Sequence, residues 1–91
     1  MMPGETNADR AATHALGALA WIVGDEGRAR RFLDLTGIDL PTLRARADDP
    51  RFLAAVIAHL EGYEPDLIAC AEALEIRPQD LAATRAMLES A

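Results

Sequence analysis

Apolar residues recur at intervals of three and four along the chain, and this spacing most constrains the fold. In residues 8–23 the spaced apolar positions are Ala12, Ala15, Leu16, Leu19, Ile22 and Val23. In residues 50–61 they are Leu53, Val56, Ile57 and Leu60. Such intervals place side chains on one face of an α-helix. No segment alternates with period two, so the sequence predicts an all-α chain.

Helix ends are marked by glycine. Gly24, Gly37 and Gly62 each follow an apolar-periodic segment, the position where a left-handed residue commonly ends a helix. Ile38 then folds back onto Leu33 in the predicted Schellman stop, as the accompanying hydrophobic contact. Glycine therefore bounds the first, second and fourth predicted helices.

Helix starts are marked by Asp, Asn and Pro. The predicted N-caps are Asn7, Asp25, Asp39 and Asp49, and the prolines of the first turns are Pro41, Pro50, Pro65 and Pro78. These signals predict helices over residues 8–23, 26–36 and 50–61. They also predict a short third helix after Asp39, a fifth from Pro65 and a sixth from Pro78. In the fifth, Leu67, Ile68, Ala71 and Leu74 are predicted to face inward.

Length limits the chain of 91 residues to one domain with a small core. We expect a flexible tail over residues 1–7 and a single helical domain over residues 8–91. The predicted architecture is a compact bundle of five to six short helices. Residues 14–50 and 52–88 share apolar positions and helix breaks, so two pseudo-repeated three-helix units are a further hypothesis.

A helix-turn-helix is the alternative interpretation of two similar stretches, LTGIDLPTLRARA (residues 35–47) and LEIRPQDLAATRA (residues 74–86). In the first, Leu33 is too large for two helices to cross closely. In the second, Ala71 is small, but Glu75 stands at the turn and disfavours a positive φ. A net charge of −6 also disfavours binding to phosphates. Nucleic-acid binding is therefore the weaker hypothesis.

Charge is distributed unevenly along the chain. Six arginines against four aspartates give residues 28–51 a sum of +2, whereas residues 52–91 sum to −5. The arginines are either solvated or face a partner. Trp21 lies off the main apolar stripe of its helix, where it either fills a gap or anchors a partner. The candidate partner-facing residues are Trp21, Arg28, Arg30, Arg31, Arg44 and Arg46.

Residues able to do chemistry are few. The chain has one cysteine, Cys70, and two histidines, His14 and His59, without the short spacings of a zinc site. We expect Cys70 to be a small buried hydrophobe and His59 a half-buried ring bonded to backbone. No catalytic residue, metal or cofactor is predicted, and we expect a protein that is not an enzyme. A small-ligand site or enzyme would instead place His59, Tyr63 or Cys70 beside a carboxyl of shifted pKa.

The longest apolar stretch, residues 15–23, is too short to span a bilayer and lacks the flanks of a signal peptide. A single cysteine is also atypical of a small secreted domain. The sequence therefore predicts a cytoplasmic protein without a membrane segment.

Several motifs resemble a family of short bacterial all-helical proteins catalogued as a domain of unknown function. The matching positions are Ala15-Leu16, Leu19-Ala20-Trp21-Ile22, Asp25, Arg31-Phe32-Leu33, Leu35, Gly37-Ile38, Phe52-Leu53 and Val56-Ile57. Cys70 stands where that family often has Phe, and Glu75 where it often has Gly. The resemblance covers residues 14–88 and implies an all-helical cytoplasmic protein, but it brings no activity, ligand or catalytic residue.

These observations favour a small non-enzymatic helical module that acts through protein–protein contacts or self-association. Its partner is either an unidentified protein or a second copy in a homodimer.

Overall fold

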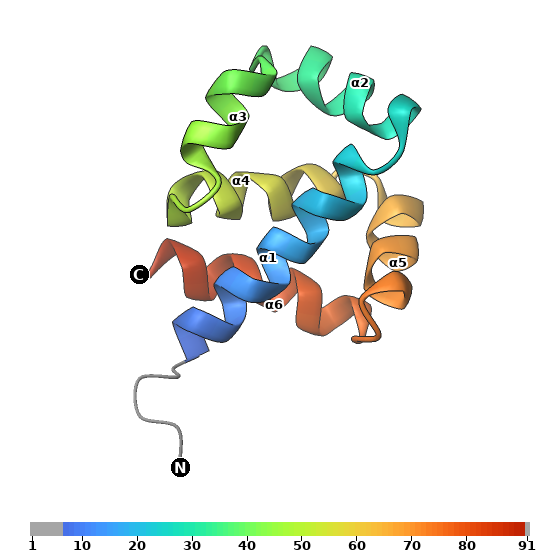
Figure 1. Ribbon diagram of the computed structural model, residues 1–91. Helices are drawn as coiled ribbons and strands as arrows, with labels where there is room; N and C mark the ends of the chain where they lie inside the picture. The colour runs from blue at the N-terminus through green and yellow to red at the C-terminus, as the bar shows by residue number, and fades with distance from the viewer. Residues whose placement is uncertain (1–6, 91) are drawn as a thin grey trace.

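A computed structural model describes residues 7–90, in which six helices and no strands are present (Figure 1). In chain order they are α1 (Asn7–Val23), α2 (Glu26–Thr36), α3 (Leu40–Arg46), α4 (Pro50–Glu61), α5 (Glu64–Ala73) and α6 (Pro78–Glu89). The predicted all-α class is confirmed. The tail predicted over residues 1–7 lies outside the described residues, except for Asn7, which is the first residue of α1.

Three aspartates cap helices as predicted. The side chains of Asp25, Asp39 and Asp49 accept hydrogen bonds from the backbone N–H groups of Arg28, Thr42 and Arg51. Each bond satisfies a donor that has no partner within its own helix. The predicted cap at Asn7 depends on a side chain outside the described residues.

The helix α4 lies at the centre of the bundle and packs most extensively on α6. The helix α1 crosses in front of both in Figure 1 and contacts both, while α5 closes one end. The core is formed mainly by small and aliphatic side chains of α1, α4 and α6, including Ala15, Ala18, Val56, Ile57 and Leu81. The α2–α3 arm (residues 26–46) adds Phe32 and Leu43 to this core.

The predicted pseudo-repeat is not reproduced in the packing. In the second unit the first and third helices, α4 and α6, form the most extensive pair in the bundle, whereas their counterparts α1 and α3 barely touch. The difference follows from the third helices. The helix α3 has seven residues and buries only Leu43, but α6 has twelve and buries Leu81, Thr84 and Leu88.

The stop between α2 and α3 differs in detail from its prediction. Gly37 has φ 71° and its N–H donates to the carbonyl of Leu33 at 2.9 Å. The N–H of Ile38 meets the hydroxyl of Thr36 at 3.4 Å. This is the single-bond αL stop, whereas the Schellman motif needs a bond from the next residue to the same carbonyl.

The Schellman motif occurs instead after α5, around Glu75. The N–H of Ile76 donates to the carbonyl of Ala71 at 3.0 Å, and that of Glu75 to Glu72 at 3.1 Å. Glu75 has φ 60°, so the expectation that it avoids positive φ was wrong. The two closing bonds and the packing of Ile76 against the core offset the strain.

Three side chains predicted to lie on an apolar, inward helix face are exposed: Leu16, Val23 and Ile68. The helix α1 meets α4 and α6 through Ala11, Ala15, Ala18, Leu19 and Ile22. Leu16 and Val23 therefore lie on its outer side, 42% and 39% exposed. Spacing alone gave two overlapping faces for this Ala-rich helix, and only the tertiary packing selects between them.

Candidate interaction surfaces

Trp21 and Arg28 form one structural unit. The guanidinium carbon of Arg28 lies 3.7 Å from the centroid of the half-buried Trp21 ring. Its Nη2 and Nε donate to the carbonyl of Trp21 at 2.8 and 3.2 Å. This carbonyl belongs to the last turn of α1, where a cation is favourable. Arg28 thus joins α2 to the end of α1, and the Trp21 ring beneath it packs against the core.

Arg30 and Arg31 also have partners within the chain. Arg30 lies 3.7 Å from Glu26, one turn away on α2, and both side chains are exposed. Arg31 lies 3.5 Å from Asp66 of α5, with its guanidinium carbon 5.5 Å from the Tyr63 ring centroid. The pair with Asp66 connects the α2–α3 arm to α5.

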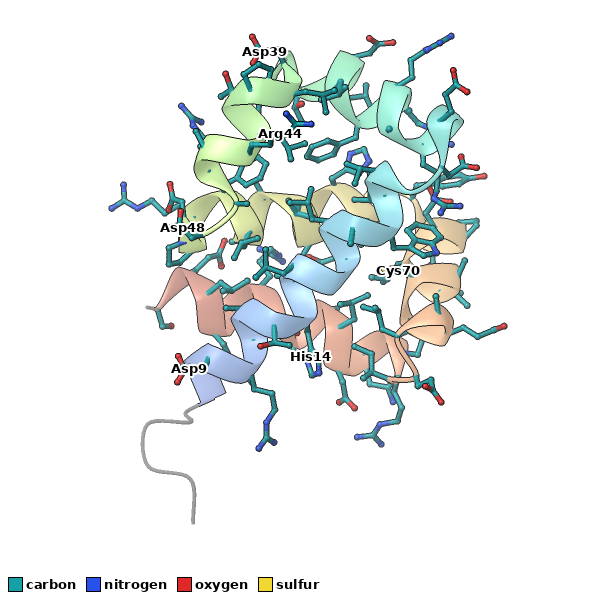
Figure 2. All side chains as sticks on the ribbon, viewed as in Figure 1. Asp9, His14, Asp39, Arg44, Asp48 and Cys70 are labelled. Atoms are coloured by element: carbon teal, nitrogen blue, oxygen red, sulfur yellow. The ribbon has the colours of Figure 1, made fainter. Side chains whose placement is uncertain are left out.

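Arg44 and Arg46 differ from the other three predicted arginines. Both are exposed, and neither has an ion-pair partner among residues 7–90. They lie in the last turn of α3, where positive charge suits the helix dipole. Figure 2 shows Arg44 on α3, well away from Cys70 on α5.

The α2–α3 arm also exposes two large apolar side chains. Leu35 is 70% exposed, the most of any exposed large hydrophobic residue described, and Leu40 is 45% exposed. Leu40 and Arg44 are four residues apart in α3 and therefore share one helical face. We call these four exposed residues of the α2–α3 arm, Leu35, Leu40, Arg44 and Arg46, the arm face, within which only Leu40 and Arg44 share one side of a helix. The sequence analysis identified its two arginines but not its leucines.

A groove lies between α5 and α6 and has a volume of about 420 Å³. Leu67 and Ile68 of α5 and Pro78 and Ala82 of α6 give it an apolar lining, and Glu61 and Glu64 contribute carboxylates. We call these six residues the acidic groove. The sequence analysis missed it because Ile68, which is 44% exposed, was predicted to face inward.

The two carboxylates of the acidic groove, Glu61 and Glu64, differ in whether they form an ion pair within the described chain. Nε of Arg85 donates to Glu61 at 2.5 Å, and this bond raises the pKa of the Arg85 guanidinium, with the charges of Glu61 and Glu89 adding to it. Glu64, the first residue of α5, has no ion-pair partner among the described side chains. The helix dipole favours a negative charge at the start of α5, and the Glu64 carboxylate can also accept a cation from a partner.

A second groove of about 250 Å³ lies between α1 and α6. Ala11 and Met87 contribute apolar surface, and Arg10, His14 and Asp80 stand around it. His14 is labelled on α1 in Figure 2. The charges there are of both signs, so this groove has no net preference for a charged ligand.

Two of the residues suspected of chemistry, His59 and Cys70, are packed within the bundle, whereas Tyr63 is 51% exposed. His59 is half-buried with its ring edge-on to Phe32, centroids 4.9 Å apart, and no backbone group bonds it in the described part of the chain, contrary to prediction. Burial lowers the pKa of His59, Asp66 raises it and Arg31 lowers it further. Cys70 is fully buried, as predicted, and burial raises the pKa of its thiol to about 11. A thiol with that pKa carries almost no nucleophilic thiolate at neutral pH.

The described chain also lacks two features. Residues 7–90 contain no group of three or more His, Cys, Asp or Glu placed to hold a metal ion. None of their helices combines the length and hydrophobicity needed to cross a membrane.

Comparison with known proteins places the chain in a family. The family described as "Protein of unknown function (DUF3572)" matches residues 8–91, so the chain belongs to it. Comparison with curated proteins and with solved structures finds no match. The family match covers nearly the whole chain and brings no specific role.

Proposed function

We propose that the chain is a non-enzymatic helical module that works in the cytoplasm through contact with another protein chain. The observation that carries this proposal is the arm face. Leu35 of α2 is 70% exposed, and α3 of the same arm carries two arginines without ion-pair partners in the described chain. Burying a leucine side chain stabilises a complex by roughly 1.5–3 kcal/mol, and arginines on the same arm can orient a partner through hydrogen bonds.

The placement of the reactive side chains supports a role other than catalysis. The Cys70 thiol is buried and protonated, and His59 packs on Phe32. Neither histidine lies within ion-pair distance of a described carboxylate. A free buried thiol also suits the reducing cytoplasm.

The helix-turn-helix alternative has less support. The candidate recognition helix, α6, has α1 and α4 packed against it. Its first turn carries Asp80, held by Arg77 at 2.9 Å, where a phosphate would have to approach. We therefore expect no shift of duplex DNA in a gel at low salt, and a shift that disappears as salt rises would favour the alternative.

Site-directed photo-crosslinking in living cells tests the proposed function. A photoreactive amino acid at Leu35 should give one or a few discrete adducts. The same group at Arg30, exposed on the same helix and paired with Glu26, serves as the matched control and should give none. Equal labelling at the two positions, or none at Leu35, would contradict the proposal.

A further inference from the structure

The arm face and the acidic groove carry opposite charge and similar apolar surface. The arm face offers Arg44, which has no ion-pair partner in residues 7–90, beside Leu40, which is 45% exposed. The acidic groove offers Glu64, equally without an ion-pair partner in that part of the chain, beside Ile68, which is 44% exposed. Each surface therefore exposes one branched apolar side chain and one charged group to water. The apolar side chains of the two surfaces could bury each other, and their opposite charges could form an ion pair.

The spacing of these groups also matches. Leu40 and Arg44 are one helical turn apart on α3, and Glu64 and Ile68 are one turn apart on α5. Four residues advance roughly 6 Å along either helix axis. If the two helices run antiparallel, Leu40 meets Ile68 while Arg44 meets Glu64. The C-terminal end of α3 then faces the N-terminal end of α5, where the helix dipoles have opposite sign.

The two surfaces of one molecule cannot reach each other. The helices α3 and α5 flank opposite ends of α4, as Figure 1 shows. The twelve residues of α4 separate them by roughly 18 Å. A contact between the arm face and the acidic groove therefore requires two molecules.

A second copy of the chain satisfies both surfaces at once. When two copies are related by a two-fold axis, each arm lies on the other's groove and the contact forms twice. Repetition matters because a stable interface buries roughly 1,200–2,000 Å² in total, more than one four-residue face provides. The imbalance of charge, +2 over residues 28–51 and −5 over residues 52–91, is then complementary within the pair.

We propose that the chain forms a reciprocal homodimer in which α3 of each copy docks antiparallel on α5 of the other, Arg44 pairing with Glu64 and Leu40 packing on Ile68. This inference rests on the proposed function, since it names the partner of the same arm face. It also assigns the acidic groove as the surface that receives the arm.

Charge reversal tests this arrangement, with the mass of the purified full chain as the readout. At micromolar concentration and near-physiological ionic strength, the wild type should sediment near twice 9.8 kDa. Arg44→Glu alone and Glu64→Arg alone each place like charges together twice per dimer. Each should raise the dissociation constant roughly tenfold or more. Arg10→Glu, the same charge change at the far end of α1, is the matched control and should leave the mass unchanged.

Mixing the two variants gives the sharper result. A heterodimer of Arg44→Glu with Glu64→Arg has opposite charges at both contacts, so the mixture should recover the dimer that each variant alone weakens. Circular dichroism checks that both variants fold. A wild-type mass of 9.8 kDa at every concentration, or a mixture that stays monomeric, overturns the homodimer. If position 35 still crosslinks to another protein, the proposed function stands without this inference; if it crosslinks to nothing, both fall.

Discussion

Replacing Glu75 by glycine should stabilise the protein, because Glu75 holds a backbone conformation that suits glycine. Its φ of 60° lies in the left-handed region, which costs a residue with a Cβ roughly 1–2 kcal/mol. Glycine avoids that cost but loses roughly 0.5–1 kcal/mol through its freer unfolded chain. The hydrogen bonds from Ile76 to Ala71 and from Glu75 to Glu72 involve only backbone and remain. We expect a net gain of about 1 kcal/mol.

A second substitution separates conformation from charge. Glu75→Ala removes the same carboxylate from a helix C-terminal end but keeps a Cβ, so it gains only the small dipole contribution. In thermal unfolding followed by circular dichroism, Glu75→Gly should melt about 4–8 °C above Glu75→Ala. Glu72→Gly is the control at a helical φ, since Glu72 lies within α5. It should lower the free energy of unfolding by about 1 kcal/mol. Equal melting temperatures for the Gly and Ala variants at position 75 would refute the reasoning.

Three further predictions concern the arm and the core. Arg28→Ala should lower the free energy of unfolding by about 1–2 kcal/mol, because it removes two hydrogen bonds and the stacking on the Trp21 ring. Arg30→Ala, which removes only an exposed ion pair, should lower it by less than about 0.5 kcal/mol. Equal losses in urea unfolding would contradict the role of Arg28 as the link between α1 and α2. Leu43→Ala should lower the free energy of unfolding by about 2–4 kcal/mol and speed amide exchange in residues 40–46, because Leu43 is the buried residue that holds α3. Leu35→Ala, at an exposed position, should change neither the stability nor the exchange. Burial raises the pKa of Cys70 to about 11, so the folded chain keeps a proton that the unfolded chain releases near pH 9. The free energy of unfolding should therefore fall between pH 9 and 11 more steeply in the wild type than in Cys70→Ala. Equal pH dependence of this free energy in the two proteins contradicts the prediction.

Helix boundaries could be predicted from the sequence because their causes are local. An aspartate that bonds an N–H two or three residues onward acts within one turn, so Asp25, Asp39 and Asp49 were recognisable without knowledge of the fold. Gly37 was recognisable for the same reason. The start of α5 was displaced by one residue because Tyr63, its N-cap, makes no side-chain bond that a residue type could reveal.

Properties that depend on neighbouring helices could not be predicted. Glu75 adopts positive φ because Ile76 must reach the core, and that core is assembled from other helices. Leu16 faces outward because α4 and α6 both contact the alanine side of α1. In each case burial elsewhere in the molecule selected a local arrangement that the sequence of that segment alone does not determine.

The arginines of residues 28–51 show why a charged segment is not yet a binding site. Arg28 caps α1 and Arg31 pairs with Asp66, so their charges are already used to hold the arm against the bundle. Arg44 and Arg46 lie beyond the last of these attachments, on a helix that buries only Leu43. A partner that pairs with them needs to break no contact within the described chain, which makes α3 the part of this segment where binding costs least. The same division explains why loss of Arg28 should lower stability, while reversal of Arg44 should act mainly on association and cost only the small dipole contribution at the end of α3.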